Sequence, residues 1–363
     1  MIYKIFNNKI KWQYPNNTEE TFYEQLNDDI LNKINYIAYP WATIVDEIGK
    51  KTTIVNYLKK KNILYKFNKN KLNVTCFQSY KYYQFINDFE KMNINVIFCP
   101  HIEKFKLIKI FRETKILILP IFLKAVINPN YDYLETFNKI NTDNKINFKD
   151  FDLDYFLKNK EFENNIKYKI SYIGANKYPG NNSNSLKASK IRNLCIDAIK
   201  NDKNNYIKVY DNWHYQNIVY GKQLNKIKFE EEKENLRYIN EINYYQNLLY
   251  SKFILCPRGI GPNSFRISET ISFNKIPIIV ADDLLLPKIN NLNISDYSIN
   301  VSEDNINFNK IISELDDTNL QKINNNLIYV KKYIDNLTEP LIDFLDERFN
   351  LLTIFYDVKN EER

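Results

Sequence analysis

Short apolar runs alternate along the whole chain with segments of helical periodicity. The apolar runs have the composition of buried strands. They occupy Ile2–Phe6, Ile34–Tyr39, Leu72–Phe77, Val96–Cys99, Ile116–Pro120, Lys167–Ile173, Tyr206–Tyr210, Lys252–Cys256, Ile276–Val280 and Tyr297–Val301. The predicted helices occupy Ala42–Ile48, Tyr82–Glu90, Lys190–Lys200, Tyr238–Tyr250, Ser264–Asn274, Phe308–Leu315, Leu320–Ile334 and Leu341–Tyr356. Alternating strands and helices predict a doubly wound parallel sheet, so the expected fold class is α/β.

A polar segment with little periodicity, Tyr131–Asn165, interrupts this alternation and is the expected boundary between two domains. The chain of 363 residues is long enough for two domains of ordinary size. We therefore predict an N-terminal domain over residues 1–160, a C-terminal domain over residues 161–335 and a terminal helical segment over residues 336–363.

The stretch Ser251–Pro287 contains the most informative pattern. An apolar strand leads into a loop with Gly259 and Gly261, two of only six glycines in the chain. A predicted helix and a second apolar strand follow, and Asp282 and Asp283 come after that strand. The carboxyl ends of parallel strands are where open α/β sheets bind ligands. The loop is therefore predicted to border a ligand site.

The residue types in this stretch suit a diphosphate. Glycines allow main-chain N–H groups to approach an anion, and the start of a helix adds partial positive charge. Arg258 and Arg266 would donate to phosphate oxygens, and Glu269 would accept from ribose hydroxyls. The pattern is also compatible with an ordinary surface connection between strand and helix that carries solvated charges.

The segment LCPRGIGPNSFRISETISFNKIPIIVADDLLLP resembles the C-terminal signature of exostosin-like glycosyltransferases, in particular those of bacteria and large viruses. The resemblance implies a GT-B fold, in which two Rossmann-like domains face a central cleft and the last helix crosses back to the first domain. It also implies an inverting transferase with Arg258, Arg266 and Glu269 at donor-contacting positions. The sequence departs from the family at Ser272–Lys275, where relatives carry a small residue and glycine, which puts the tightness of that turn in doubt.

Other residues of the predicted C-terminal domain are candidates for binding the donor nucleotide. Relatives have a strand similar to Lys167–Ile173, so Gly174 and Asn176 are expected to border the diphosphate. Asn263 and Ser264 lie where the loop becomes a helix. Trp213 and His214 lie on a loop that could flank the nucleotide base, but the pattern favours aromatic side chains packed at the surface.

Two residues of the predicted N-terminal domain are candidates for the base that deprotonates the acceptor hydroxyl. The stretch NYIAYPWATIVDEI resembles an N-terminal motif of the same family and places Asp46 at a strand-to-helix junction. His101 follows a predicted strand end and could also contact phosphate. The alternatives are that Asp46 lies on a solvated helix face and that His101 is structural.

Composition excludes several classes of function. The net charge of +7 arises from interspersed basic residues without a dense block, so we expect no nucleic-acid partner. This charge suits phosphorylated substrates and peripheral association with an anionic membrane surface. The four cysteines form no C-x-x-C pair. A D-x-D pattern at Asp152–Asp154 lies in the expected linker, so we predict neither a metal site nor a cofactor.

The predicted function is transfer of a hexosyl or glycuronosyl group from a nucleotide sugar, with UDP as the nucleotide, to a carbohydrate acceptor in polysaccharide biosynthesis. The alternatives are a fucosyltransferase-like enzyme that uses GDP-fucose and a non-catalytic glycan-binding or scaffold subunit. No apolar run has the length of a signal peptide or membrane helix, so we expect a cytoplasmic protein, including at the inner membrane face. The sugar, the acceptor and the oligomeric state are left open.

Overall fold

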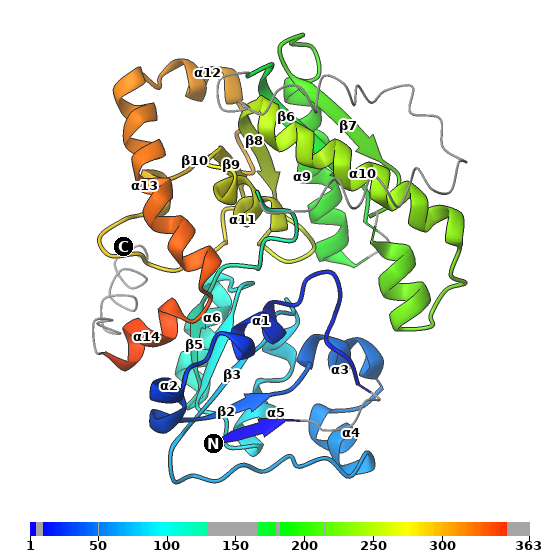
Figure 1. Cartoon of the computed structure of the whole chain (residues 1–363), viewed down its shortest axis with the longest axis vertical. Helices are drawn as coiled ribbons and strands as arrows, with labels where there is room; N and C mark the ends of the chain where they lie inside the picture. Colours follow the sequence, from blue (N-terminus) through cyan, green and yellow to red (C-terminus); the bar gives the residue numbers. More distant parts are fainter. Residues whose placement is uncertain (5–9, 50, 130–165, 179–181, 214, 347–363) are drawn as a thin grey trace.

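Two five-stranded parallel sheets form the centres of two α/β domains in the computed structural model (Figure 1). The structure describes residues 1–4, 10–49, 51–129, 166–178, 182–213 and 215–346. The first sheet has the order β1-β2-β3-β4-β5, with strands at Ile2–Lys4, Ile34–Ala38, Leu72–Cys76, Val96–Cys99 and Leu117–Pro120. The second sheet has the order β10-β9-β8-β6-β7. Its strands, from β6 to β10, are Tyr168–Ala175, Tyr206–Tyr210, Ser251–Pro257, Ile276–Val280 and Ile299–Asn300.

Helices connect successive strands in both domains. In the first domain they are α1 Thr18–Glu24, α2 Asp28–Lys33, α3 Trp41–Ile48, α4 Ile54–Lys60, the 3-10 turn η1 Tyr82–Gln84, α5 Ile86–Lys91 and α6 Lys104–Glu113. In the second domain they are α9 Ser183–Ile199, the π-helix η3 Asn217–Gln223, α10 Glu231–Tyr250, α11 Phe265–Ser272 and the 3-10 turn η4 Ile294–Asp296. Further helices follow the last strand: α12 Phe308–Ser313, α13 Asp317–Asp335 and α14 Glu339–Leu345.

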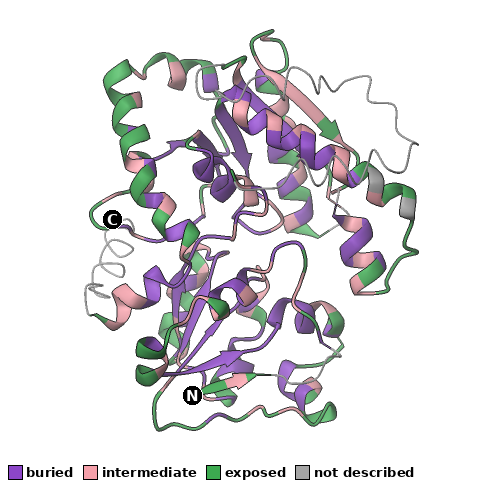
Figure 2. Ribbon diagram, in the orientation of Figure 1, coloured by how far each residue is buried: buried purple, intermediate pink, exposed green. Residues whose placement is uncertain are grey.

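The inner strands are largely buried because helices cover the sheets, as Figure 2 shows. Every residue of β2, β4 and β9 is buried. Strands covered on both faces read as continuous apolar runs, which is why the sequence located them correctly. The predicted GT-B arrangement of two Rossmann-like domains is confirmed. The predicted strand Tyr297–Val301 was too long, since only Ile299–Asn300 pairs with β9.

In the turn after α11, Asn274 occupies a position where the family resemblance predicted a small residue and glycine. Asn274 adopts a left-handed conformation with φ of 54°. The N–H groups of Asn274 and Lys275 donate to the carbonyls of Ile271 and Thr270 at 2.9 and 3.0 Å. These contacts form a tight C-terminal cap, and asparagine is the residue that most readily replaces glycine in it. The turn therefore remains short enough to bring β9 beside β8.

The C-terminal helices run from the second domain back to the first (Figure 1). Gln25, which follows α1, donates to the carbonyl of Asp335 at 2.6 Å and accepts from the N–H of Leu337 at 2.8 Å. Lys33 and Asp346 form an ion pair at 3.6 Å. The predicted helix Leu341–Tyr356 is described only as far as α14. The expected boundary Tyr131–Asn165 lies outside the described residues.

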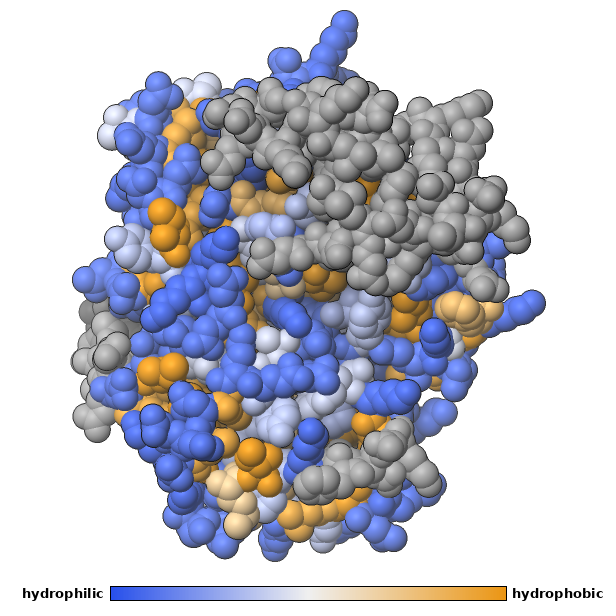
Figure 3. Space-filling model, in the orientation of Figure 1, coloured by the Kyte–Doolittle hydropathy of each residue, from blue (hydrophilic) through white to orange (hydrophobic). Residues whose placement is uncertain are grey.

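Main-chain contacts also join the domains between β4 and β9. Glu103 and Leu284 form an antiparallel bridge. Lys104 donates to the carbonyl of Asp283, and Leu285 donates to the carbonyl of Ile102, both at 3.1 Å. The face shown in Figure 3 is largely hydrophilic, with separate apolar patches. Across the described segments, no helix is both long and apolar enough to cross a membrane.

Candidate active site

A cavity of about 280 Å³ lies between the two domains. The first domain contributes Tyr80 and His101, and the connection that follows β5 contributes Val126 and Ile127. The second domain contributes the ends of β6 and β7, the loop after β8 and the first turns of α11. This is the carboxyl edge of the parallel sheet, where a ligand site was expected.

The loop between β8 and α11 lines this cavity with Gly259, Ile260 and Gly261. Its ends are held together because Gly259 donates to the carbonyl of Asn263 at 3.2 Å. The N–H groups of Ile260 and Gly261 donate to no residue in the described parts of the chain. A Cβ atom on Gly261 would lie 2.7 Å from both His101 Nδ1 and Tyr80 Cβ. Glycine at this position therefore lets the loop lie against the first domain.

Arg266 projects from the first turn of α11 into the cavity wall. It donates from Nε at 3.1 Å and from Nη2 at 2.6 Å to the carbonyl of Ile173. Its guanidinium also lies over the Tyr172 ring, 4.8 Å from the centroid. No Asp or Glu oxygen of the described residues lies within 4.0 Å of it. The cation is thus fixed in place without a carboxylate partner.

Glu269 lies one turn further along α11 and is 5% exposed. One carboxylate oxygen accepts from the Tyr244 hydroxyl at 2.7 Å, and the other accepts from the N–H of Ile127 at 3.4 Å. Burial raises the pKa of Glu269, while the Tyr244 hydrogen bond acts in the opposite direction. The side chain borders the cavity and also joins α11 to the connection after β5.

His101 follows β4 and reaches the cavity from the opposite side. Burial and the charge of Arg258 lower the pKa of His101 to about 3, so its imidazole is neutral at physiological pH. Its Nδ1 atom is buried and has no hydrogen-bond partner within the described residues. The neighbouring carbonyl of Pro100 accepts a hydrogen bond of 2.7 Å from Asn263 Nδ2. Asn263 thus links the loop to the segment that carries His101.

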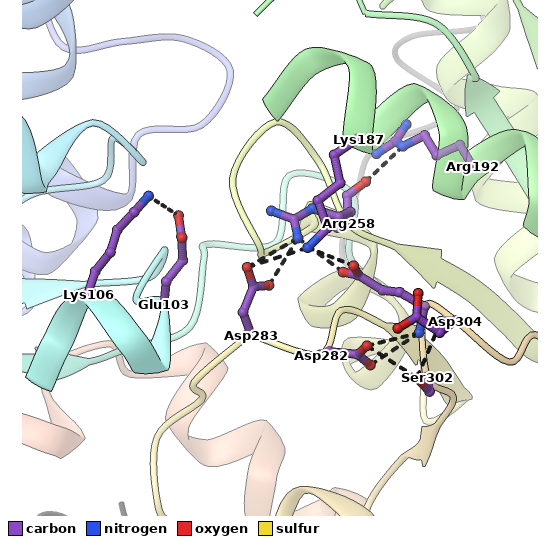
Figure 4. A network of polar contacts seen from close by, with 10 residues as sticks. Glu103, Lys106, Lys187, Arg192, Arg258, Asp282, Asp283, Ser302 and Asp304 are labelled. Atoms are coloured by element: carbon purple, nitrogen blue, oxygen red, sulfur yellow. Dashed lines mark hydrogen bonds and ion pairs between the residues drawn. The ribbon is translucent and has the colours of Figure 1, made fainter. Parts of the chain in front are cut away.

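Arg258 lies outside the group of residues that line the cavity. Its Nη1 atom forms ion pairs of 3.0 Å with both Asp283 and Glu303, and Lys187 lies 2.8 Å from Glu303 (Figure 4). Only 2% of Arg258 is exposed. The structure therefore places this predicted donor-contacting residue in an ion-pair network behind the loop.

Asp46 and Asn176 also lie outside the cavity lining. Asp46 lies on α3 and forms an ion pair with Lys81 at 3.0 Å and a hydrogen bond with Gln13 at 2.9 Å. Burial, followed by the Asp46 carboxylate, raises the pKa of the cavity residue Tyr220, which shows that Asp46 lies close by. Asn176 donates to Asn193 at 2.7 Å. The remaining predicted site residues line the cavity: His101, Gly174, Gly259, Gly261, Asn263, Ser264, Arg266 and Glu269.

Several cavity residues were not identified from the sequence as site residues. Arg192 and Tyr178 lie near the end of β6, and Tyr244 lies on α10. Trp213, which was considered, lines the cavity and lies nearly parallel to Phe265, with ring centroids 6.5 Å apart and planes inclined by 10°. His214 and Asp152–Asp154 are outside the described residues. Within the described residues, no group of three or more His, Cys, Asp or Glu side chains is placed to hold a metal ion.

The similarity to known proteins lies mainly in the second domain, which contains the loop between β8 and α11. Residues 158–314 match the family model of the exostosin GT47 domain. A "Probable glucuronosyltransferase" of Oryza sativa subsp. japonica is 38% identical over 63 residues, which is 17% of this chain and 15% of the relative. "Probable beta-1,4-xylosyltransferase IRX10L" of Arabidopsis thaliana is 36% identical over 63 residues, with the same two shares. The chain thus matches only a small part of these relatives' lengths.

Two solved structures are remotely similar to this chain. HepE of Anabaena, crystallised with UDP and glucose, has a TM-score of 0.35 at 10% identity, covering 92% of this chain and 79% of that one. A glycosyltransferase of Rickettsia africae has a TM-score of 0.29 at 11% identity, covering 88% of this chain and 90% of that one. The two α/β domains and the loop site define a protein of the GT-B type. Over residues 158–314, which include this loop and α11, the chain is similar to the exostosin GT47 domain.

Proposed function

We propose that this protein transfers a sugar from a UDP-sugar donor to a carbohydrate acceptor. The observation that carries the proposal is the guanidinium of Arg266, which is fixed in the cavity wall without a carboxylate partner among the described residues. A cation removed from water is costly unless an opposite charge compensates it. The unbonded N–H groups of Ile260 and Gly261 lie on the neighbouring loop. A diphosphate would satisfy both the cation and these amides.

The same groups would assist departure of the nucleotide. In the proposed inverting step, an acceptor oxygen attacks the anomeric carbon and loses its proton to a base, while the bond from that carbon to the phosphate oxygen breaks. Negative charge then grows on the departing diphosphate, where Arg266 would stabilise it without a metal ion. Glu269 would accept from the ribose hydroxyls.

The base is proposed to be His101 or Asp46. His101 lines the cavity as a neutral imidazole, and a nearby diphosphate would favour its protonated form. Asp46 is engaged with Lys81, so it would need a rearrangement of that ion pair before it could accept a proton. The variants Asp46→Asn and His101→Gln would separate the two assignments, because only loss of the base should strongly lower turnover.

Calorimetric titration with UDP and GDP, followed by a hydrolysis screen against nucleotide sugars, tests the proposal. Binding of UDP together with release of UDP from one UDP-sugar would support it. Selective binding of GDP would favour a fucosyltransferase-like enzyme. Binding of neither nucleotide would favour a non-catalytic glycan-binding or scaffold subunit, and the proposed transfer reaction would then be wrong.

A further inference from the structure

Arg192 is a second cation of the cavity wall, and the family motif does not contain it. It projects from the middle of α9 and is 5% exposed. Its Nη1 atom donates to the carbonyl of Ala175 at 2.7 Å, and its Nε atom donates to the carbonyl of Arg258 at 2.9 Å. The Tyr178 ring covers it, with the centroid 4.7 Å from the guanidinium carbon. These contacts fix the guanidinium at the carboxyl ends of β6 and β8.

The anchors of Arg192 and Arg266 place the two cations near each other. Arg192 donates to Ala175 and Arg266 donates to Ile173, and these carbonyls belong to residues on either side of Gly174. Both cations also lower the pKa of Tyr178, although burial raises it overall. Two guanidinium groups held so close repel each other unless an anion lies between or beside them.

The charges around the three arginines near the loop differ sharply. Arg258 is neutralised by Asp283 and Glu303. Neither Arg192 nor Arg266 has an Asp or Glu oxygen within 4.0 Å in the part of the chain that the structure describes. Both line the cavity, whereas Arg258 does not. The positive charge without an ion-pair partner in that part of the chain is therefore located on Arg192 and Arg266, although Arg266 also lowers the pKa of the buried Glu269 carboxylate one turn along α11.

We propose that Arg192 and Arg266 together bind the diphosphate of the ligand and that Arg258 is a positioning residue. Arg258 acts through its carbonyl, which accepts from Arg192, while its side chain is fixed by Asp283 and Glu303. The identity of the ligand as a nucleoside diphosphate rests on the proposed function. The binding of a diphosphate group by Arg192 does not, because it follows from the two uncompensated cations.

The test is the ratio of affinities for UDP and uridine, measured by calorimetry in the parent protein and in Arg192→Gln. The ratio isolates the contribution of the phosphates. Loss of a hydrogen-bonded charge should reduce it roughly tenfold to a hundredfold, with uridine affinity little changed. Lys190→Gln is the matched control, since it removes one positive charge from the same helix at an exposed side chain that does not line the cavity. Its ratio should equal that of the parent.

Inorganic pyrophosphate is titrated in parallel so that the two proposals can fail separately. If pyrophosphate binds and Arg192→Gln weakens it while UDP and GDP do not bind, Arg192 keeps its role and the proposed function is wrong. If Arg192→Gln keeps the parent ratio of UDP affinity to uridine affinity, Arg192 has only a structural role at the strand ends and this inference is wrong. If the parent protein binds neither pyrophosphate nor nucleotide, both proposals are wrong. Should Arg192→Gln not fold, as judged by circular dichroism, Arg192→Met is read by the same criteria.

Discussion

The Nη2 atom of Arg266 lies 1.8 Å from the position that a Cβ atom would occupy on Gly174. Gly174 also has a φ of 147°, a conformation that residues with a side chain rarely adopt. The end of β6 therefore leaves room for the guanidinium only because residue 174 is glycine. The sequence predicted that a backbone would approach a ligand here, and the structure shows a side chain of the same domain in that space.

Gly174→Ala should displace Arg266 from the Ile173 carbonyl and weaken UDP binding. The expected loss of affinity is about a hundredfold, comparable to removal of a charged hydrogen bond together with local strain. Calorimetry measures it. Gly49→Ala is the control, because Gly49 has a φ of 58° but no atom within 4 Å of a Cβ position. That variant should lose about 1 kcal/mol of stability and keep its UDP affinity.

Arg266→Ala should lower turnover by about 10² or more, because it removes a cation placed where negative charge would develop. The fold should persist, since the guanidinium contacts one carbonyl and one ring face. Steady-state assay with the UDP-sugar identified by the screen gives the turnover. The control is Arg112→Ala, an exposed arginine on α6. Turnover at the parent rate in Arg266→Ala would contradict the assignment.

Arg258→Met should destabilise the fold rather than act on the diphosphate directly. Among the described residues, it would leave the carboxylates of Asp283 and Glu303 with Lys187 as their sole cationic partner. Breaking a buried ion pair in this way costs about 3–5 kcal/mol, measurable by urea unfolding. Lys187→Met removes the more exposed cation and should cost at most about 1 kcal/mol. If the two substitutions lowered the free energy of unfolding equally, Arg258 would not be the main cationic partner of Asp283 and Glu303.

Glu19 should make stability depend on pH. It is buried on α1 and accepts from the N–H groups of Ala42 and Gln78 at 3.1 and 3.0 Å. Burial raises the pKa of Glu19 from 4.5 to about 8, although these hydrogen bonds oppose the shift. Between these two values the folded protein holds a proton that the unfolded chain has released. The contribution of Glu19 to stability is therefore full below pH 4.5 and is lost as the pH rises toward 8.

Glu19→Gln keeps an amide oxygen that can accept the same N–H groups but cannot titrate. Relative to this variant, the parent protein should lose stability between pH 5 and pH 8 by up to about 1.4 kcal/mol per pH unit. Urea unfolding of both proteins at several pH values measures the difference. A difference that does not change with pH would show that Glu19 has the same ionisation state in the folded and unfolded protein.

The sequence predicted the strands and the loop of the second domain because their signals are local. Ile276–Val280 is a continuous apolar run, and the strand occupies those residues. The helix containing Arg192 was expected to begin at Lys190, but it begins at Ser183, where the Asn182 side chain caps it by accepting from the N–H of Ser185. Asparagine at a helix start is a recognised signal that was overlooked in this polar segment.

The environments of the arginines could not be predicted in the same way. The carbonyl anchors of Arg192 belong to Ala175 and Arg258, and the carboxylates around Arg258 belong to Asp283 and Glu303. These residues lie far apart in the sequence and meet only where the parallel strands end together. A single arginine on an amphipathic helix carries no sequence signal for such a meeting. The motif therefore located the site but did not indicate which cations are left uncompensated.

The hydrogen bond from Asn263 to the Pro100 carbonyl lies beside the main-chain bridge between Glu103 and Leu284. One short segment after β4 is thus attached to the loop between β8 and α11 and also to the segment after β9. Opening the cavity by rotating one domain away from the other would have to detach both attachments at once. The segment after β4 would therefore have to be released from both neighbours before the two domains could separate there.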